Sequence, residues 1–188
     1  GGTDTMVEIN FNHYKPETIV ALRKVQELRS YSIQDDKGVI FIGSGVPYQM
    51  LENDPFLKLL PALAQASRTV GSPQIRAAGS LGGNLGTCSP AGDGLPVLSA
   101  LDATVHLQSV DSSREVLIHD FMVGVKKNAR MPDEIITGVT VPILRGFQGY
   151  SKVGVRNAMV ISVASACLAI DASQSQVRLA LGAVGPTI

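Results

Sequence analysis

The chain has 188 residues, 45% of them hydrophobic and 17% charged, which predicts a sizeable core and excludes a disordered chain. Its net charge is zero, which argues against nucleic-acid binding, because the phosphate backbone selects a basic surface. The longest apolar run, residues 158–170, is too short for a membrane span and predicts buried core. Cys88 and Cys167 give no metal spacing, so no metal site in this chain is expected, and a reducing cytoplasm is the expected location.

Strands are expected near the start of the chain. Residues 18–22 predict a short buried strand, because apolar and β-branched side chains follow one another there. Residues 30–33 and 39–42 predict a hairpin, since Asp35-Asp36-Lys37-Gly38 between them is a favourable turn.

Two helices are expected next. Pro47 suits the first turn of a helix that would bury Tyr48, Leu51 and Met50. Asp54 would cap a longer second helix that ends near Gly71. The buried stripe of that helix has helical spacing and consists of Phe56, Leu59, Leu60, Leu63 and Ala64.

The second half of the chain adds a helix and more strands. We expect a helix at 95–101 and strands at 104–110, 115–118, 135–141, 150–153 and 176–181. Pro and Gly cluster at 142–149, which favours a domain boundary there. Helices and strands mix without regular βαβ alternation, so the expected fold class is α+β rather than a doubly wound sheet.

Two glycine-rich stretches carry the chemistry of the sequence. One is Gly1-Gly2-Thr3-Asp4-Thr5, and the other, GSLGGNLGTCSPAGD, runs from Gly79 to Asp93. Glycine lets backbone N–H groups approach a ligand, and consecutive N–H groups form an anion-binding concavity. Hydroxyl and amide side chains in the second stretch can donate to phosphate, and Asp93 can accept from a ribose hydroxyl. Two such loops can hold one pyrophosphate, which predicts a dinucleotide-binding protein with FAD as the leading candidate.

Other interpretations of these residues stay open at this point. The second stretch is also compatible with a plain tight turn, and it matches neither the Rossmann fingerprint nor a P-loop. Cys88 inside it is expected to be a buried filler rather than a redox thiol. Lys152 and Arg156 form either a solvated basic face or a charge beside a flavin. No catalytic residue is expected, because no nucleophile or carboxylate pair stands out, so any chemistry would come from a cofactor.

Several motifs together resemble the FAD-binding medium subunit of the molybdenum hydroxylases, the family of xanthine dehydrogenase and aerobic carbon monoxide dehydrogenase. They are GGTD followed by MVE, SLGGNL through SPAGD, and then QIR, PDEII, YSKVG, RNAM and ALGAVGPT in the expected order. The resemblance covers essentially the whole chain. The family subunit has a short piece before the first glycine loop and a longer domain after the last strand, so the resemblance implies truncation at both ends.

The resemblance implies a fold like the vanillyl-alcohol oxidase and MurB flavoproteins, with two α+β subdomains holding FAD. Residues 1–145 would be the FAD-binding domain, and 146–188 would begin a small C-terminal α+β domain. The implied cofactor-binding residues are Gly1, Gly2, Thr3, Asp4 and Thr5 in the first loop, Ser80, Gly83, Asn84 and Thr87 in the second, and Asp93, Ile136 and Lys152 beyond them. Asp93 would meet the adenosine side, Ile136 would lie near the flavin, and Lys152 would sit by its ring.

The implied function is electron transfer inside a cytoplasmic oxidoreductase. A large molybdopterin subunit would oxidise the organic substrate. Electrons would pass through a small subunit with two [2Fe-2S] clusters to the FAD of this chain, and then to NAD, oxygen or a quinone. A heterohexamer of two heterotrimers is typical of the family, without nucleic acid or a membrane span. The alternatives are a stand-alone FAD-dependent oxidoreductase of the same fold and a structural module that has lost its flavin.

Overall fold

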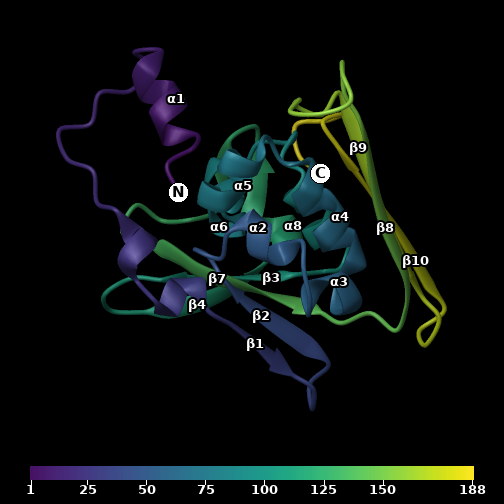
Figure 1. Ribbon diagram of the computed structural model, residues 1–188. Helices are drawn as coiled ribbons and strands as arrows, with labels where there is room; N and C mark the ends of the chain where they lie inside the picture. Colours follow the sequence, from purple (N-terminus) through teal and green to yellow (C-terminus); the bar gives the residue numbers. More distant parts are fainter.

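The computed structural model describes residues 1–188 and has three layers: a five-stranded sheet, a group of short helices, and a three-stranded sheet (Figure 1). Every strand pair is antiparallel. The five-stranded sheet has the order β1 (Tyr31–Gln34), β2 (Val39–Gly43), β7 (Ile135–Pro142), β3 (Thr104–Gln108) and β4 (Ser113–Leu117). The predicted α+β class is confirmed.

The helices lie between the two sheets, except for α1 (Thr5–Asn10), which stands apart from the body (Figure 1). The others are α2 (Tyr48–Leu51), α3 (Phe56–Leu59), α4 (Pro61–Thr69), α5 (Pro73–Ala78), α6 (Leu81–Thr87), α7 (Gly94–Ala100) and α8 (Ile118–Phe121). Two single turns, η1 (Leu22–Lys24) and η2 (Glu27–Arg29), precede β1. The strands β5 (Met122–Gly124) and β6 (Lys127–Asn128) form a separate two-stranded sheet. The longest helix, α4, has nine residues, and no helix could cross a bilayer.

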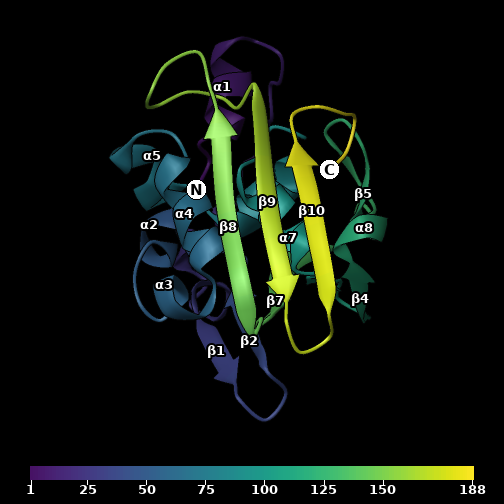
Figure 2. The same cartoon turned by 90° about the vertical axis from the view of Figure 1, so that its right-hand side faces the viewer.

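The third layer is the sheet of β8 (Gly146–Val153), β9 (Ala164–Asp171) and β10 (Gln176–Gly182). Figure 2 shows this sheet in front of α4 and α7. Its inner face places Cys167, Ala169 and Ala180 in the same hydrophobic core as the first sheet and the helices. One continuous core therefore joins the layers.

The hairpin predictions are confirmed. Residues 35–38 form the turn between β1 and β2, and β3 and β4 pair around the turn at 109–112. The strands expected at 135–141 and 176–181 and the helix expected at 95–101 are also present, as β7, β10 and α7. Alternation of buried and partly buried side chains along β9 follows from its position as the central strand of a sheet with one face on the core.

The strand expected at residues 18–22 is wrong. Residues 18–21 have no regular structure, Leu22 begins η1, and Ile19 and Val20 are 59% and 78% exposed. An apolar run forms a strand only when a neighbouring strand satisfies its backbone, and none lies beside this segment.

The long second helix is divided into α3 and α4. Leu60 lies between them in a non-helical conformation, because Pro61 clashes with a helical residue before it. Asp54 makes no cap hydrogen bond, and Pro55 occupies the cap position instead. The predicted stripe is nevertheless buried, with Leu59 only partly so. Met50, expected in the core, is exposed.

The apolar run at 158–170 is only partly core. Met159, Ile161 and Val163 are exposed, Ser162 between them is buried, and the apolar side chains of the run are buried only on the inner face of β9. The exposed half of the run crosses the edge of the layer of helices, where it reaches the functional cleft.

Candidate functional site

The second glycine-rich stretch is a helix over half its length, not the loop that its composition indicated. Ser80 begins α6, and its Oγ accepts a hydrogen bond from the N–H of Gly83 at 3.2 Å. Gly82 packs directly on Ser44 in the turn after β2, where a side chain at position 82 would collide with Ser44. Glycine at this position therefore allows α6 to lie against the five-stranded sheet.

The first glycine stretch lies beside the second, although about 80 residues separate them. Gly1 packs against the carbonyl of Ala78, just before α6. At the other end of α6, Thr87 Oγ1 donates to Asp4 Oδ2 at 3.0 Å. Asp4 therefore ties the first loop to the second, as its expected role in holding the loop requires.

A cleft of about 420 Å³ opens between the two stretches. Ten of the twelve predicted site residues line it: Gly1, Gly2, Thr3, Asp4, Thr5, Ser80, Gly83, Asn84, Thr87 and Asp93. A second cavity of about 310 Å³ shares Gly1, Ser80 and Gly83 with the cleft and contains Ile136. The shared residues make the two cavities adjacent compartments, in the size range of small-molecule sites.

The two stretches offer different donors. The N–H groups of Gly2, Thr3 and Asp4 make no hydrogen bond within the chain. In the second stretch, the N–H groups of Gly82, Gly83 and Asn84 are already bonded to Ser44 and Ser80. The first stretch therefore supplies free backbone donors, and the second supplies side chains such as Asn84 and Thr87 together with the unbonded N–H groups of Ser80, Ser89 and Asp93.

Asp93 closes the far end of the cleft with a buried hydrogen-bond network. Its Oδ1 accepts from Tyr150 Oη and Ser162 Oγ, both at 2.8 Å, and its Oδ2 accepts from Lys152 Nζ at 2.8 Å. Burial, with Asp93 close by, raises the pKa of Tyr150 above its ordinary value, so the phenol stays protonated as a donor. Three donors leave this carboxylate little capacity for a ribose hydroxyl.

Lys152 has all three protons engaged. Its Nζ donates to Asp93, to the carbonyl of Thr69 at the end of α4, and to the carbonyl of Val160, at 2.8–3.0 Å. Its side chain is only 9% exposed. It faces a broad hollow, also lined by Tyr150 and Val160, which meets the cleft at Met159 and Val160.

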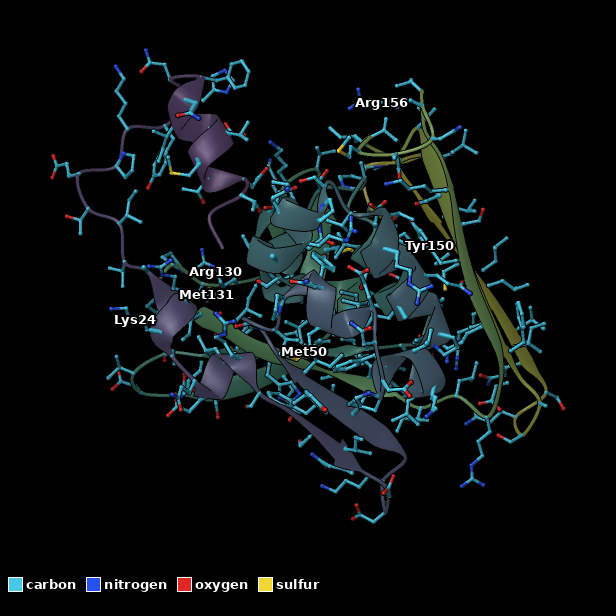
Figure 3. The ribbon with its side chains drawn as sticks, in the orientation of Figure 1. Lys24, Met50, Arg130, Met131, Tyr150 and Arg156 are labelled. Carbon is cyan, nitrogen blue, oxygen red and sulfur yellow. The ribbon has the colours of Figure 1, made fainter.

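Asp93 and Lys152 lie side by side and are bonded to each other, although they are expected at the adenosine side and by the flavin ring respectively. Ile136 lines the compartment on the other side of Gly83 and does not share a cavity with Lys152. Arg130, which lines the compartment of Ile136, and Tyr150, which lies beside Lys152, are on opposite sides of the helices in Figure 3.

The compartment of Ile136 has apolar walls and a cationic border. Arg23, Arg29 and Arg130 line it together with Glu134. The carboxylate of Glu134 is engaged by Arg114, whose Nε and Nη2 lie 2.6 and 2.9 Å from its oxygens. The guanidinium of Arg114 and the N–H of Met131 lower the pKa of Glu134 to about 2.

Cys88 follows α6 and behaves as the predicted filler. Burial raises the pKa of its thiol to about 11, so the reactive thiolate is not populated at neutral pH.

Sequence reasoning missed three residues of the site: Tyr48, Tyr150 and Ser162. Tyr48 was expected only in the core, yet it also lines the cleft. Tyr150 belongs to the YSKVG motif, whose alternation places it on the same face as Lys152, and this spacing was the available signal. Ser162 gives no comparable signal, because it lies between strands.

Comparison with known proteins gives consistent matches. The family described as the FAD binding domain in molybdopterin dehydrogenase matches residues 1–144. The nicotinate dehydrogenase FAD-subunit of Eubacterium barkeri is 37% identical over 183 residues, covering 94% of this chain and 61% of that protein. The glyceraldehyde dehydrogenase medium chain of Sulfolobus acidocaldarius is 31% identical over 188 residues, covering 98% of this chain and 66% of that protein. The chain thus spans slightly less than two thirds of these relatives.

Solved structures agree in fold. Quinoline 2-oxidoreductase from Pseudomonas putida 86 gives a TM-score of 0.91 at 25% identity, covering 99% of this chain and 66% of that chain. Carbon monoxide dehydrogenase from Hydrogenophaga pseudoflava gives a TM-score of 0.92 at 23% identity, with the same coverage, and this match shows the shared fold.

Proposed function

The chain belongs to the FAD-binding domain family of molybdopterin dehydrogenases, and we propose that it is the electron-transfer portion of such an enzyme. The single observation that carries the proposal is the cleft between the two glycine stretches, which holds ten of the twelve residues expected to contact FAD. The relatives named above are dehydrogenase and oxidoreductase subunits.

The residues of the cleft fit FAD. A pyrophosphate needs several hydrogen-bond donors without a carboxylate aimed at it, and the free N–H groups of Gly2, Thr3 and Asp4 supply donors. One oxygen of the Asp4 carboxylate accepts from Thr87, and both oxygens of Asp93 are engaged by its network, so Asp93 is not a free acceptor facing the phosphates. Gly83 lies between the two compartments, where it leaves the middle of the cleft open.

The two halves of FAD would extend into the two compartments. The isoalloxazine ring is larger than adenine, and the Lys152 side is the larger, since the cleft of about 420 Å³ meets a further hollow there. Met159, Val160 and Ile161 offer apolar cover on that side. We therefore assign the flavin half to the Lys152 side and the adenine half to the compartment of Ile136, where arginine side chains can stack on a base.

When bound, FAD would supply the one- and two-electron chemistry that side chains lack. The chain's own residues bind and orient it. Ser80 fixes the first turn of α6, Asp4 ties the first glycine pair to Thr87, and Lys152 fixes the carbonyl of Val160 beside the cleft. No proton needs to move at any of these atoms.

The partners are part of the proposal. We propose that a small subunit with two [2Fe-2S] clusters delivers electrons from a large molybdopterin subunit, and that NAD, oxygen or a quinone accepts them. A heterohexamer and a cytoplasmic location remain predictions. If the full-length chain alone oxidised an organic substrate, the stand-alone alternative would replace this proposal.

A matched pair of variants in α6 tests the site. Gly83 and Gly86 lie one turn apart, both exposed, but only Gly83 lines the cleft. In the full-length protein within its native complex, Gly83→Leu should weaken FAD binding at least about tenfold, because the side chain enters the cleft. The measurement is the flavin released per chain and its dissociation constant in reconstitution.

Gly86→Ala is the control, since a Cβ there meets only the Ile136 side chain, at an ordinary contact distance of 4.0 Å, and lies outside the cleft. It should keep the wild-type flavin content. Equal loss in both variants would attribute the effect to α6 itself and would contradict the proposed site. Absence of flavin from the wild-type complex would contradict the function.

A further inference from the structure

Two buried polar atoms beside the cleft have no hydrogen-bond partner in the chain. They are the hydroxyl oxygen of Tyr48 and the side-chain carbonyl oxygen of Asn84. Tyr48 is only 3% exposed, yet both residues line the cleft. A buried polar group without a partner is costly, so such atoms call for an explanation.

The two atoms lie on the same side of α7. A Cβ at Gly94 would lie 3.3 Å from Tyr48 Oη and 3.2 Å from Asn84 Oδ1, so both atoms border one point next to that glycine. The backbone holds the Tyr48 ring there, because its N–H donates to the carbonyl of Gly79 and Pro47 bridges to Ser80. The phenol therefore lies beneath the start of α6.

The two atoms are also complementary. A phenol is a donor, and an amide oxygen is an acceptor. Burial and the nearby carboxylate of Asp93 raise the pKa of Tyr48 above its ordinary value, so the donor proton is retained. The Asn84 amide packs against Gly92 and Gly94, and a rotation about its side-chain bonds is enough to bring Oδ1 toward the enclosed Tyr48 hydroxyl.

We propose that Tyr48 is a positioning residue for the cofactor: its hydroxyl donates to Asn84 Oδ1 when FAD binds and so holds the Asn84 amide with Nδ2 presented to the ligand. This inference rests on the proposed FAD site. An amide has two ends, and fixing the acceptor end on Tyr48 leaves its two N–H donors for a ligand oxygen. The bond converts two unpartnered atoms into a pair at the moment of binding.

The test uses the full-length subunit in its native complex, with FAD removed and then titrated back while flavin fluorescence is followed. Tyr48→Phe removes only the hydroxyl and should weaken FAD binding about three- to tenfold, as expected for one neutral hydrogen bond. Asn84→Ala should weaken it at least as much. The double variant should bind FAD no more weakly than Asn84→Ala alone, because Tyr48 acts through Asn84.

Tyr31→Phe is the matched control. Tyr31 packs edge-on against Phe56, is 38% exposed and does not line the cleft, so FAD affinity should stay at the wild-type value. The unfolding temperature of the flavin-free Tyr48→Phe variant should not fall, since the hydroxyl has no partner to lose.

Wild-type affinity in Tyr48→Phe, or losses that add fully in the double variant, would overturn the inference while leaving the FAD site intact. An equal fall in unfolding temperature with and without FAD would assign Tyr48 a purely structural role. Failure of the wild-type protein to bind FAD would instead contradict the proposed function.

Discussion

Glu134 secures the turn that leads into β7. Its two carboxylate oxygens accept from Arg114 and from the N–H of Met131, at 2.6–2.9 Å. The pKa of Glu134 falls to about 2 from its ordinary value of 4.5, chiefly through the hydrogen bond from Arg114. A carboxylate with a lowered pKa contributes stability above its unfolded pKa and loses that contribution as pH falls toward its folded pKa.

We predict that Glu134→Gln lowers the urea midpoint at pH 7 and that the difference from wild type shrinks between pH 4.5 and 2. Over that interval the wild-type carboxylate becomes protonated and loses its ionic partner. The measurement is the urea midpoint of both proteins across this range. Glu17→Gln is the control, since Glu17 is exposed and has no ion-pair partner, so it should give no such trend. A constant difference down to pH 2 would contradict the prediction.

Residue type alone predicted much of the cleft. Glycines, hydroxyls and amides in two stretches indicated a phosphate-binding site, and the structure brings those residues together. Residue type did not predict the network around Asp93, because Tyr150 and Ser162 come from segments more than 50 residues away in the sequence. Tyr48 was interpreted as core, which its burial supports, but no sequence pattern reveals that its hydroxyl lacks a partner.

At the scale of elements, α6 shows why glycine-rich sequence is a weak guide to local structure. Each glycine inside a helix costs about 1 kcal/mol relative to alanine, which favours a loop. Here the Ser80 cap and the close contact of Gly82 with Ser44 outweigh that preference. Both are tertiary or positional effects, whereas the hairpin turn at Asp35–Gly38 is local and was therefore predictable.

The buried pair of Lys152 and Asp93 joins three elements: β8, α7 and the end of α4. We predict that Lys152→Met destabilises the protein by about 3–5 kcal/mol, because it leaves a buried carboxylate without its cation. The double variant Lys152→Met/Asp93→Asn should recover part of that loss, since the unpaired charge is removed. Urea unfolding of the single and double variants measures both effects.

A double variant less stable than Lys152→Met would contradict this account of the pair. Lys58→Met is the control, because Lys58 pairs with Asp54 on the exposed surface, where ion pairs contribute little. It should leave the free energy of unfolding close to the wild-type value.

At the scale of the whole molecule, the two large sheets share one core through the helices between them: α4 and α7 contact the three-stranded sheet, and α6 and α8 contact the five-stranded sheet. The expected boundary at residue 145 separates two sheets, but the inner face of β9 contributes Cys167 and Ala169 to the common core. The Pro and Gly cluster at 142–149 indicated where the chain passes from the five-stranded to the three-stranded sheet. It could not indicate how closely the two sheets pack on a common core.

We predict a single cooperative unfolding transition for residues 1–188. Ala169→Asp places a charge in the shared core and should lower the urea midpoint seen by circular dichroism and by amide exchange in β3 alike. Ala172→Asp, in the exposed turn after β9, should change neither. Unfolding of the three-stranded sheet ahead of β3 would contradict the prediction.

Helix α1 has no buried residue, and its links to the body are polar contacts such as that of Asp4 with Thr87 and that of Glu8 with Lys126. Such contacts open at far lower free energy than a packed core. The first glycine stretch is therefore held to the body largely by polar contacts, and we expect the pair of Glu8 with Lys126 to weaken as ionic strength rises, because salt screens exposed charges.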